Sequence, residues 1–181
     1  MKRALCTAMV ILVPVSMGTL VACGDATSAP SPPSPAGPAA SPGAAPPAPT
    51  PAVTSDCPYL DTEWVADTNG QHVTSVRISS TEGGSPPSCF FYRPDGGLQV
   101  AVRVYQGNVA TARAIVDLAA PVSTSDPADQ PAGWQGGYQT TNPGAVYAVA
   151  KNGDAVVVNT NQAQSIKARE IAMRTIAALK L

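Results

Sequence analysis

The chain has 181 residues, with 11 Lys and Arg against 12 Asp and Glu, so its formal net charge is −1 at pH 7. Charged residues are sparse and form no dense basic cluster, which argues against nucleic-acid binding and against recruitment to an anionic membrane surface by bulk charge. Prolines crowd between residues 30 and 51 and divide the chain into segments of different composition.

The N-terminus has the pattern of an export signal. Met1-Lys2-Arg3 is a short positive segment, and the apolar stretch Ala4–Leu20 follows it. The next residues, Leu20-Val21-Ala22-Cys23, form a lipobox, in which small residues precede a cysteine that takes a diacylglyceryl group. We therefore expect residues 1–22 to be a lipoprotein signal peptide and Cys23 to anchor the protein at the outer face of the cell membrane. The alternative is an ordinary signal peptide with an unrelated cysteine after it.

Residues 23–56 are expected to be a disordered tether. Ala, Pro, Ser, Thr and Gly make up nearly all of this segment, which has too little apolar surface to offset its ordering entropy. Its proline density favours extended polyproline conformation. The tether is interpreted as a spacer, and O-glycosylation of its Ser and Thr residues is a second reading.

Two of the four cysteines remain to be placed in the mature domain, since Cys6 lies within the signal peptide and Cys23 is the lipidation site. Export favours pairing of Cys57 with Cys89 in an oxidising compartment. The bond would close a loop of about thirty residues, which contributes about 3–4 kcal/mol in the chain-entropy model. Two independent buried thiols are the alternative.

The first half of the domain, which we expect over residues 57–181, begins with a short helix at 61–67. Alternating apolar residues predict strands at 73–79 and 98–105, and a short aromatic run predicts a strand at 89–93, which forms a hairpin with 98–105. Asn108 is a candidate N-cap for a helix at 109–119.

The second half starts with a proline-rich loop at 121–133. Strands are predicted at 134–140, 145–150 and 155–160, and Asn152-Gly153 marks the hairpin between the last two. A helix over 165–181 ends the chain. The order predicts an α+β fold: one antiparallel sheet of about six strands, in two βββα halves, covered by the two longer helices.

From residue 57 onward the chain resembles the DUF2020 family, a domain of unknown function in exported lipoproteins of high-GC Gram-positive bacteria. The resemblance rests on the order of several short motifs: Cys57-Pro58-Tyr59-Leu60, Trp64-Val65, Cys89, Pro127-Ala128-Asp129, Ala132-Gly133-Trp134, Val146-Tyr147-Ala148-Val149, Asn159-Thr160-Asn161-Gln162 and Ser165-Ile166-Lys167-Ala168. It implies a small α+β domain and brings no established activity, cofactor or catalytic residue.

The sequence contains no motif that predicts catalysis, a metal site or a cofactor. His72 is the only histidine, and no nucleophile motif accompanies it. The carboxylates lack the spacing of a calcium loop, and there is no phosphate-binding glycine loop. We therefore expect no catalytic, metal-binding or cofactor-binding residues.

Two segments are candidate binding surfaces. One is the long loop with Asp126 and Asp129, followed by Trp134. The other is the polar run with Asn159 and Asn161 before the last helix, whose N-terminus could accept an anion. Each has a structural alternative: Trp134 in the core for the first, and helix capping by Asn161 or Ser165 for the second.

Three functions are compared. We favour a non-catalytic envelope module that binds a protein or an envelope component, because a long tether lets a small domain search the volume above a membrane. A carrier of a lipid or hydrophobic small molecule, held between sheet and helices, is the alternative. An envelope hydrolase is third.

Overall fold

The computed structural model describes residues 43–81 and 84–181. The predicted signal peptide, Cys23 and residues 23–42 of the predicted tether lie outside the described residues. The described residues all belong to one compact unit, Pro38–Leu181.

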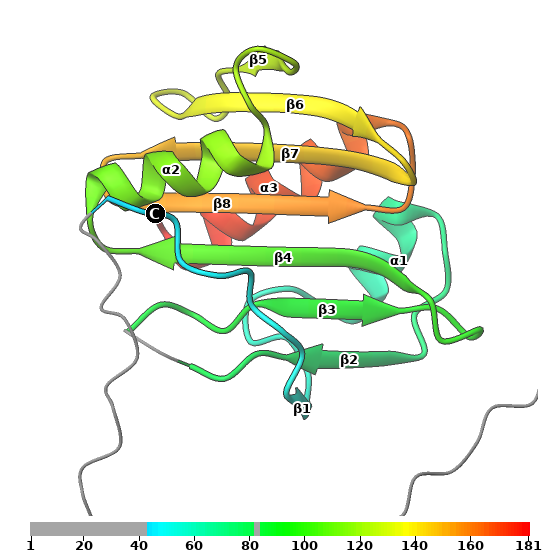
Figure 1. The fold of residues 1–181 in the computed structure, drawn as a ribbon. Helices are drawn as coiled ribbons and strands as arrows, with labels where there is room; N and C mark the ends of the chain where they lie inside the picture. The colour runs from blue at the N-terminus through cyan, green and yellow to red at the C-terminus, as the bar shows by residue number, and fades with distance from the viewer. Residues whose placement is uncertain (1–42, 82–83) are drawn as a thin grey trace, which may run out of the picture. The chain divides into compact units, whose positions relative to one another are not determined.

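The domain is built on one antiparallel sheet, which confirms the α+β class (Figure 1). The strands are β1 Val53–Thr54, β2 Ser75–Ile78, β3 Cys89–Tyr92, β4 Leu98–Gln106, β5 Asp126–Ala128, β6 Gln135–Thr141, β7 Gly144–Lys151 and β8 Asp154–Thr160. The helices are α1 Thr62–Asn69, α2 Val109–Ala119 and α3 Ser165–Leu179. The eight strands follow the order β1-β2-β3-β4-β8-β7-β6-β5, so two meanders meet where β4 pairs with β8.

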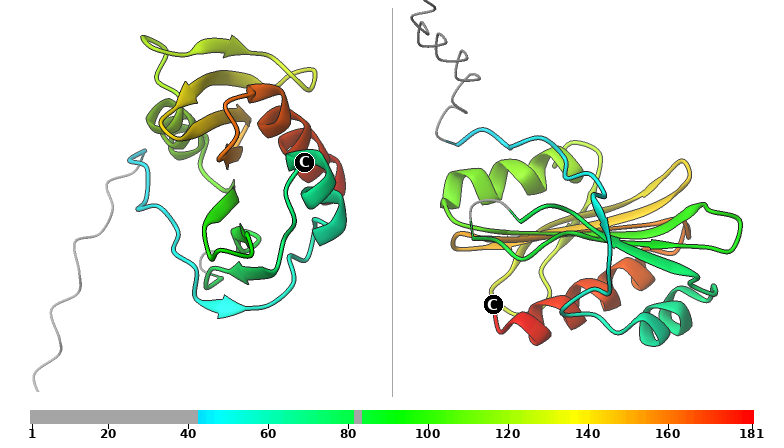
Figure 2. Two further views of the ribbon diagram at one scale, coloured as in Figure 1. Left: turned by 90° about the vertical axis from the view of Figure 1, so that its right-hand side faces the viewer. Right: turned by 90° about the horizontal axis from the view of Figure 1, so that it is seen from below.

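Helix α2 lies on one face of the sheet, and α1 and α3 lie on the other (Figure 2). On β7, Val146 and Ala148 pack in one cluster with α2, whereas Tyr147 and Val149 pack in the other cluster with α3. The strand is buried from Gly144 through to residue 150 because both of its faces are covered. The two predicted βββα halves are therefore not equivalent: each is a meander followed by a helix, but α2 and α3 cover different faces.

The predicted count of about six strands is wrong, because a short strand lies at each edge of the sheet. β1 has two residues and pairs with β2; β5 has three and pairs with β6. Neither segment has an alternating apolar pattern, and Pro127 within β5 removes a ladder donor. Short edge strands with proline are a common way of ending a sheet, since they offer little backbone for pairing with another chain.

Local signals in the sequence set several element boundaries. The Asn108 side chain accepts hydrogen bonds from the backbone N–H groups of Ala110 and Thr111, which confirms it as the N-cap of α2. Gly70 ends α1 with φ 74°, and Asn152 occupies the β7–β8 turn with φ 54°.

A disulfide joins Cys57 to Cys89, as predicted, and both cysteines are buried. Cys57 lies just before α1, and Cys89 is the first residue of β3. The bond therefore ties the entry of the domain to an inner strand of the sheet.

The ordered domain begins before residue 57, the predicted boundary. Residues 43–56, expected as part of the tether, pack on the domain: β1 pairs with β2, and the Ala52 N–H donates to the Ile78 carbonyl at 2.9 Å. The composition of this segment suggested disorder because its own apolar content is low. Its contacts come from the sheet beneath it, which composition does not reveal.

Candidate binding site

The segment 43–52, here called the strap, crosses one face of the sheet. It begins near the first turn of α2, where a Cβ added at Gly43 would lie 3.4 Å from Ala110 Cβ, and Ala45 packs against the α2 cluster. From there it crosses β8 and β4 and leads into β1 (Figure 1). The face it crosses is the α2 face, beside the helix and not under it (Figure 2).

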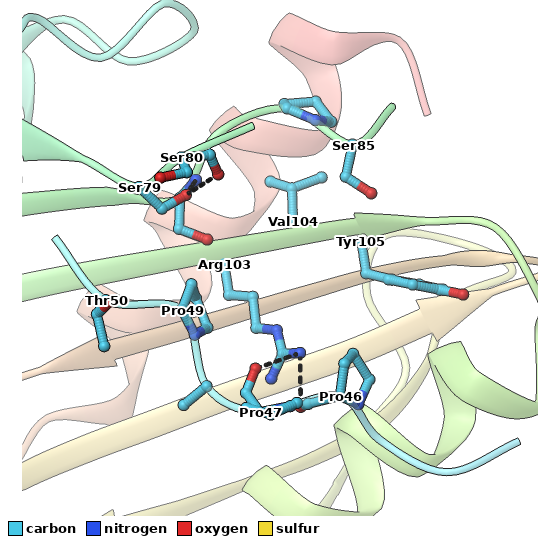
Figure 3. Close-up of a pocket in the computed structure, with 13 residues that line it drawn as sticks. Pro46, Pro47, Pro49, Thr50, Ser79, Ser80, Ser85, Arg103, Val104 and Tyr105 are labelled. Atoms are coloured by element: carbon cyan, nitrogen blue, oxygen red, sulfur yellow. Dashed lines mark hydrogen bonds between the residues drawn. The ribbon is translucent and has the colours of Figure 1, made fainter. Parts of the chain in front are cut away.

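Arg103 holds the middle of the strap. It lies on β4 between Val102 and Val104, which belong to the core on the α3 side, so its own side chain points to the opposite face. Arg103 Nη2 donates to the carbonyl oxygens of Pro46 at 3.1 Å and Pro47 at 3.3 Å. Figure 3 shows the side chain extended toward these two residues.

This contact suits a proline-rich segment. Proline has no backbone N–H, so a run of prolines cannot add to a sheet as a strand and offers carbonyl oxygens as its polar groups. The guanidinium supplies donors only, in a planar array that can reach two acceptors together. Burial lowers the pKa of Arg103, but an arginine stays protonated at neutral pH even so.

The strap leaves open space on both of its sides. On one side is a recess of about 610 Å³ between the strap and the loop after β2, lined by strap residues 46–50, by Arg103 and by serines that include Ser79 and Ser85 (Figure 3). On the other side is a groove of about 300 Å³ between the strap and α2. We call the surface beneath the strap, together with these two flanks, the strap groove.

The flank toward α2 is mainly apolar. Phe90, Ala101 and Val157 form its floor on the sheet, and Ile115, Leu118 and Ala119 form its wall on α2. Leu118 has 70% of its surface exposed, while Ile115 below it is buried. A chain lying in the strap groove would therefore find hydrogen-bond donors at Arg103 and an apolar wall beside it.

The first predicted binding surface is divided by the structure. Asp126 is exposed at the start of β5. Asp129 lines a small cavity of about 150 Å³ with Tyr138, Tyr147 and Arg169. Trp134 is 2% exposed and belongs to the core, so its place in a binding surface was wrong and the core alternative is the correct one.

The second predicted surface is divided as well. Asn159 is exposed and lines the apolar flank of the strap groove. Asn161 instead belongs to a cluster of amide side chains near the end of β8, where it hydrogen-bonds Gln71 at 2.8 Å and Asn69 at 3.2 Å. The N-cap of α3 is Gln164, whose side chain makes no capping hydrogen bond, so the structural alternative, capping by Asn161 or Ser165, is wrong.

The amide cluster has a structural role. Asn69 is fully buried at the end of α1 and donates to Gln99 of β4 at 3.0 Å, and Gln99 donates to the His72 carbonyl. Lys167 of α3 donates to the Asn69 carbonyl at 2.8 Å. These bonds fasten α1 and the start of α3 to one end of the sheet.

The strap groove was missed at the sequence level, although one signal was present. Arg103 occupies an outward position on a strand whose other outward residues are small or neutral, Ala101 and Tyr105. Its partners lie 56 and 57 residues earlier in the chain, in a segment of low complexity. No short-range pattern connects the two.

Across residues 43–81 and 84–181, no helix combines the length and apolar character needed to cross a membrane. The same residues bring together no group of three or more His, Cys, Asp or Glu side chains that could hold a metal ion.

A comparison with curated proteins gives no match. The family model described as "Domain of unknown function (DUF2020)" matches residues 42–181, which includes the whole strap and every helix and strand of the described residues. The protein therefore belongs to the DUF2020 family.

Proposed function

We propose that the protein is a lipid-anchored, non-catalytic binding module of the cell envelope, and that it binds extended proline-rich segments of envelope proteins in the strap groove. Cys23 supplies the anchor and residues 24–42 the spacer. The observation that supports the ligand class is the pair of hydrogen bonds from Arg103 to two successive proline carbonyls of the chain itself. A peptide of the same kind would meet the same donors and the same apolar wall.

Space in the strap groove supports the same assignment. The strap leaves about 610 Å³ open on one flank and about 300 Å³ on the other, so a longer or bulkier segment than the strap has room for contacts that the strap does not make. Extended proline-rich chains lose little conformational entropy on binding, which favours recognition by a shallow groove of this size.

The test uses a mature chain in which the strap competes poorly with an added peptide for the groove. This open-groove variant carries three substitutions, Pro46→Gly, Pro47→Gly and Pro49→Gly. They keep the length of the strap and remove its conformational restriction. A peptide with the strap sequence 44–51 is titrated into this variant and followed by calorimetry or by backbone NMR shifts on β4 and α2. We expect saturable binding, with shifts at Arg103 and Leu118.

Arg103→Ala in the same background removes both donors and should weaken the peptide at least about tenfold, since hydrogen bonds from a charged group contribute about 1.5–3 kcal/mol. Arg113→Ala is the matched control, because it removes the same charge from an exposed position on α2. Equal affinity in the two arginine variants, or no binding in the open-groove variant, would contradict the proposal.

Anchoring is tested separately in cells. Replacement Cys23→Ala should abolish incorporation of labelled palmitate and release the protein from the membrane fraction, whereas C57A/C89A should leave both unchanged. Labelling that survives Cys23→Ala would contradict lipidation at this residue.

A carrier of a hydrophobic small molecule is the second candidate, favoured by the apolar floor and wall of the flank toward α2. Native mass spectrometry of the protein purified from its own envelope separates the two. A bound lipid that is lost on Leu118→Glu supports the carrier; a ligand-free mass together with peptide binding supports the module.

A further inference from the structure

We propose that the strap groove accepts a second segment of the same chain, residues 31–35, in place of strap residues 45–49. The inference rests on the proposed function, because it names a particular occupant of the same groove. The two segments share one pattern: Ser31-Pro32-Pro33-Ser34-Pro35 and Ala45-Pro46-Pro47-Ala48-Pro49 both read small-Pro-Pro-small-Pro. The sequence has one further Pro-Pro pair, Pro86-Pro87, which is fixed within the domain because the Pro87 carbonyl accepts from Tyr59.

The contacts of the strap are of a kind that residues 31–35 can reproduce. Arg103 binds carbonyl oxygens of the paired prolines, and Pro32-Pro33 offers the same acceptors at the same spacing. No functional group of a strap side chain takes part in these two bonds.

At the remaining two positions, 45 and 48, the upstream segment has serine where the strap has alanine. Ala45 packs against the α2 cluster as a partly buried side chain, and Ala48 borders both open flanks. Serine adds one oxygen to alanine. At position 48 that oxygen would face open space and not a closed core, so the exchange of Ala48 for Ser34 needs no repacking.

The length of the chain permits the exchange. With Pro49 in place, residues 50–52 bridge Pro49 to β1. With Pro35 in that position, residues 36–52 bridge the same gap as a longer loop. Loop-closure cost rises only with the logarithm of length, so the exchange is disfavoured modestly and 45–49 remains the main occupant.

The outcome is a tether with two lengths. When 45–49 is bound, residues 24–44 separate Cys23 from the groove; when 31–35 is bound, residues 24–30 do. At ~3.1 Å per extended residue, these correspond to about 65 Å and about 22 Å. A partner peptide that displaces 45–49 would then meet competition from residues 31–35 of the same protein.

The experiment places a photo-crosslinking amino acid at Leu118, which is 70% exposed and lines the groove opposite the strap. The full mature chain is irradiated and its cross-linked peptides are identified by mass spectrometry. Cross-links to 44–52 should dominate in the wild type. In the open-groove variant, cross-links to 29–37 should rise at least about fivefold.

Two added sets of substitutions test the cause of that rise. Pro32→Gly, Pro33→Gly and Pro35→Gly in the open-groove background should cancel it. Pro38→Gly with Pro42→Gly is the matched control and should leave it unchanged, since these prolines lie between the two segments and have no proline neighbour. Thermal unfolding and the intact disulfide report that each variant is folded.

The inference is overturned if the open-groove variant gives no cross-links to 29–37, or if these persist after the three upstream prolines are replaced. In a mixture of isotopically light and heavy chains, cross-links that join one light chain to one heavy chain would overturn it, because the occupant would then be a second copy of the protein. If the free 44–51 peptide binds while 29–37 is never captured, only this inference fails. If neither the peptide nor 29–37 reaches the groove, the proposed function fails with it.

Discussion

Removing the Cys57–Cys89 disulfide should lower the free energy of unfolding by about 3–4 kcal/mol. The two cysteines are 32 residues apart, and a loop of that length constrains the unfolded chain by about this amount in the chain-entropy model. In a domain of about 140 residues, 1 kcal/mol corresponds to a Tm change of about 3–4 °C, so the Tm should fall by about 10–15 °C.

The assay compares C57A/C89A with the wild type by urea unfolding, with reduced wild type as a third sample. Reduction removes the cross-link and leaves both sulfur atoms, whereas the alanines also remove buried side-chain volume, so the double variant should be the less stable of the two. The m-value should rise in both because the unfolded chain exposes more surface without the cross-link. A loss below about 1 kcal/mol in reduced wild type, with an unchanged m-value, would refute the reasoning.

Three other perturbations test other parts of the structure. Arg103→Met keeps an apolar stem but removes both strap hydrogen bonds. Limited proteolysis within residues 43–52 should become several-fold faster, while the Tm of the domain falls by only a few degrees. Unchanged cleavage would show that Arg103 does not hold the strap. Ile171→Ala, at a fully buried site, should cost about 2–5 kcal/mol in denaturant unfolding, against less than about 0.5 kcal/mol for Leu118→Ala at its exposed site. Burial raises the pKa of Tyr59 well above its ordinary 10.0, so above pH 10 the folded state keeps the phenolic proton while the unfolded state releases it. The free energy of unfolding should therefore not depend on this group below pH 10 and should fall as the pH rises above 10. Tyr59→Phe should make that fall less steep.

Most elements of the fold could be predicted because their signals are local. Asn108 caps α2 through N–H groups two and three residues ahead, and Gly70 and Asn152 adopt the positive φ that their turns need. Strands β2 and β4 follow from apolar alternation, and β7 and β8 from short apolar runs on either side of the Asn152-Gly153 turn. The arrangement of the helices did not follow from the same patterns, although the unbroken apolar run of β7 carries the relevant signal: a strand with polar residues on neither face needs cover on both.

The candidate site depended on contacts that are distant in sequence. Trp134 follows a long polar loop, and only the packed structure shows that the chain turns inward there. Asn159 and Asn161 are two residues apart, yet one lines the strap groove and the other joins the amide cluster, because β8 ends between them at Thr160. The outward position of Arg103 could not reveal its partners, because these are carbonyl oxygens, which every residue carries.

Under the proposed anchoring at Cys23, the position of the disulfide has a mechanical consequence. A pull on that end would first strip the strap from Arg103 and then separate the two-residue pairing of β1 with β2. The force then acts on the Cys57–Cys89 disulfide, which transmits it from Cys57 directly to Cys89 in β3. Residues 58–88, which include α1 and β2, are bypassed and carry no tension, so the domain can yield the length of the strap and β1 while the other seven strands and the helices stay assembled.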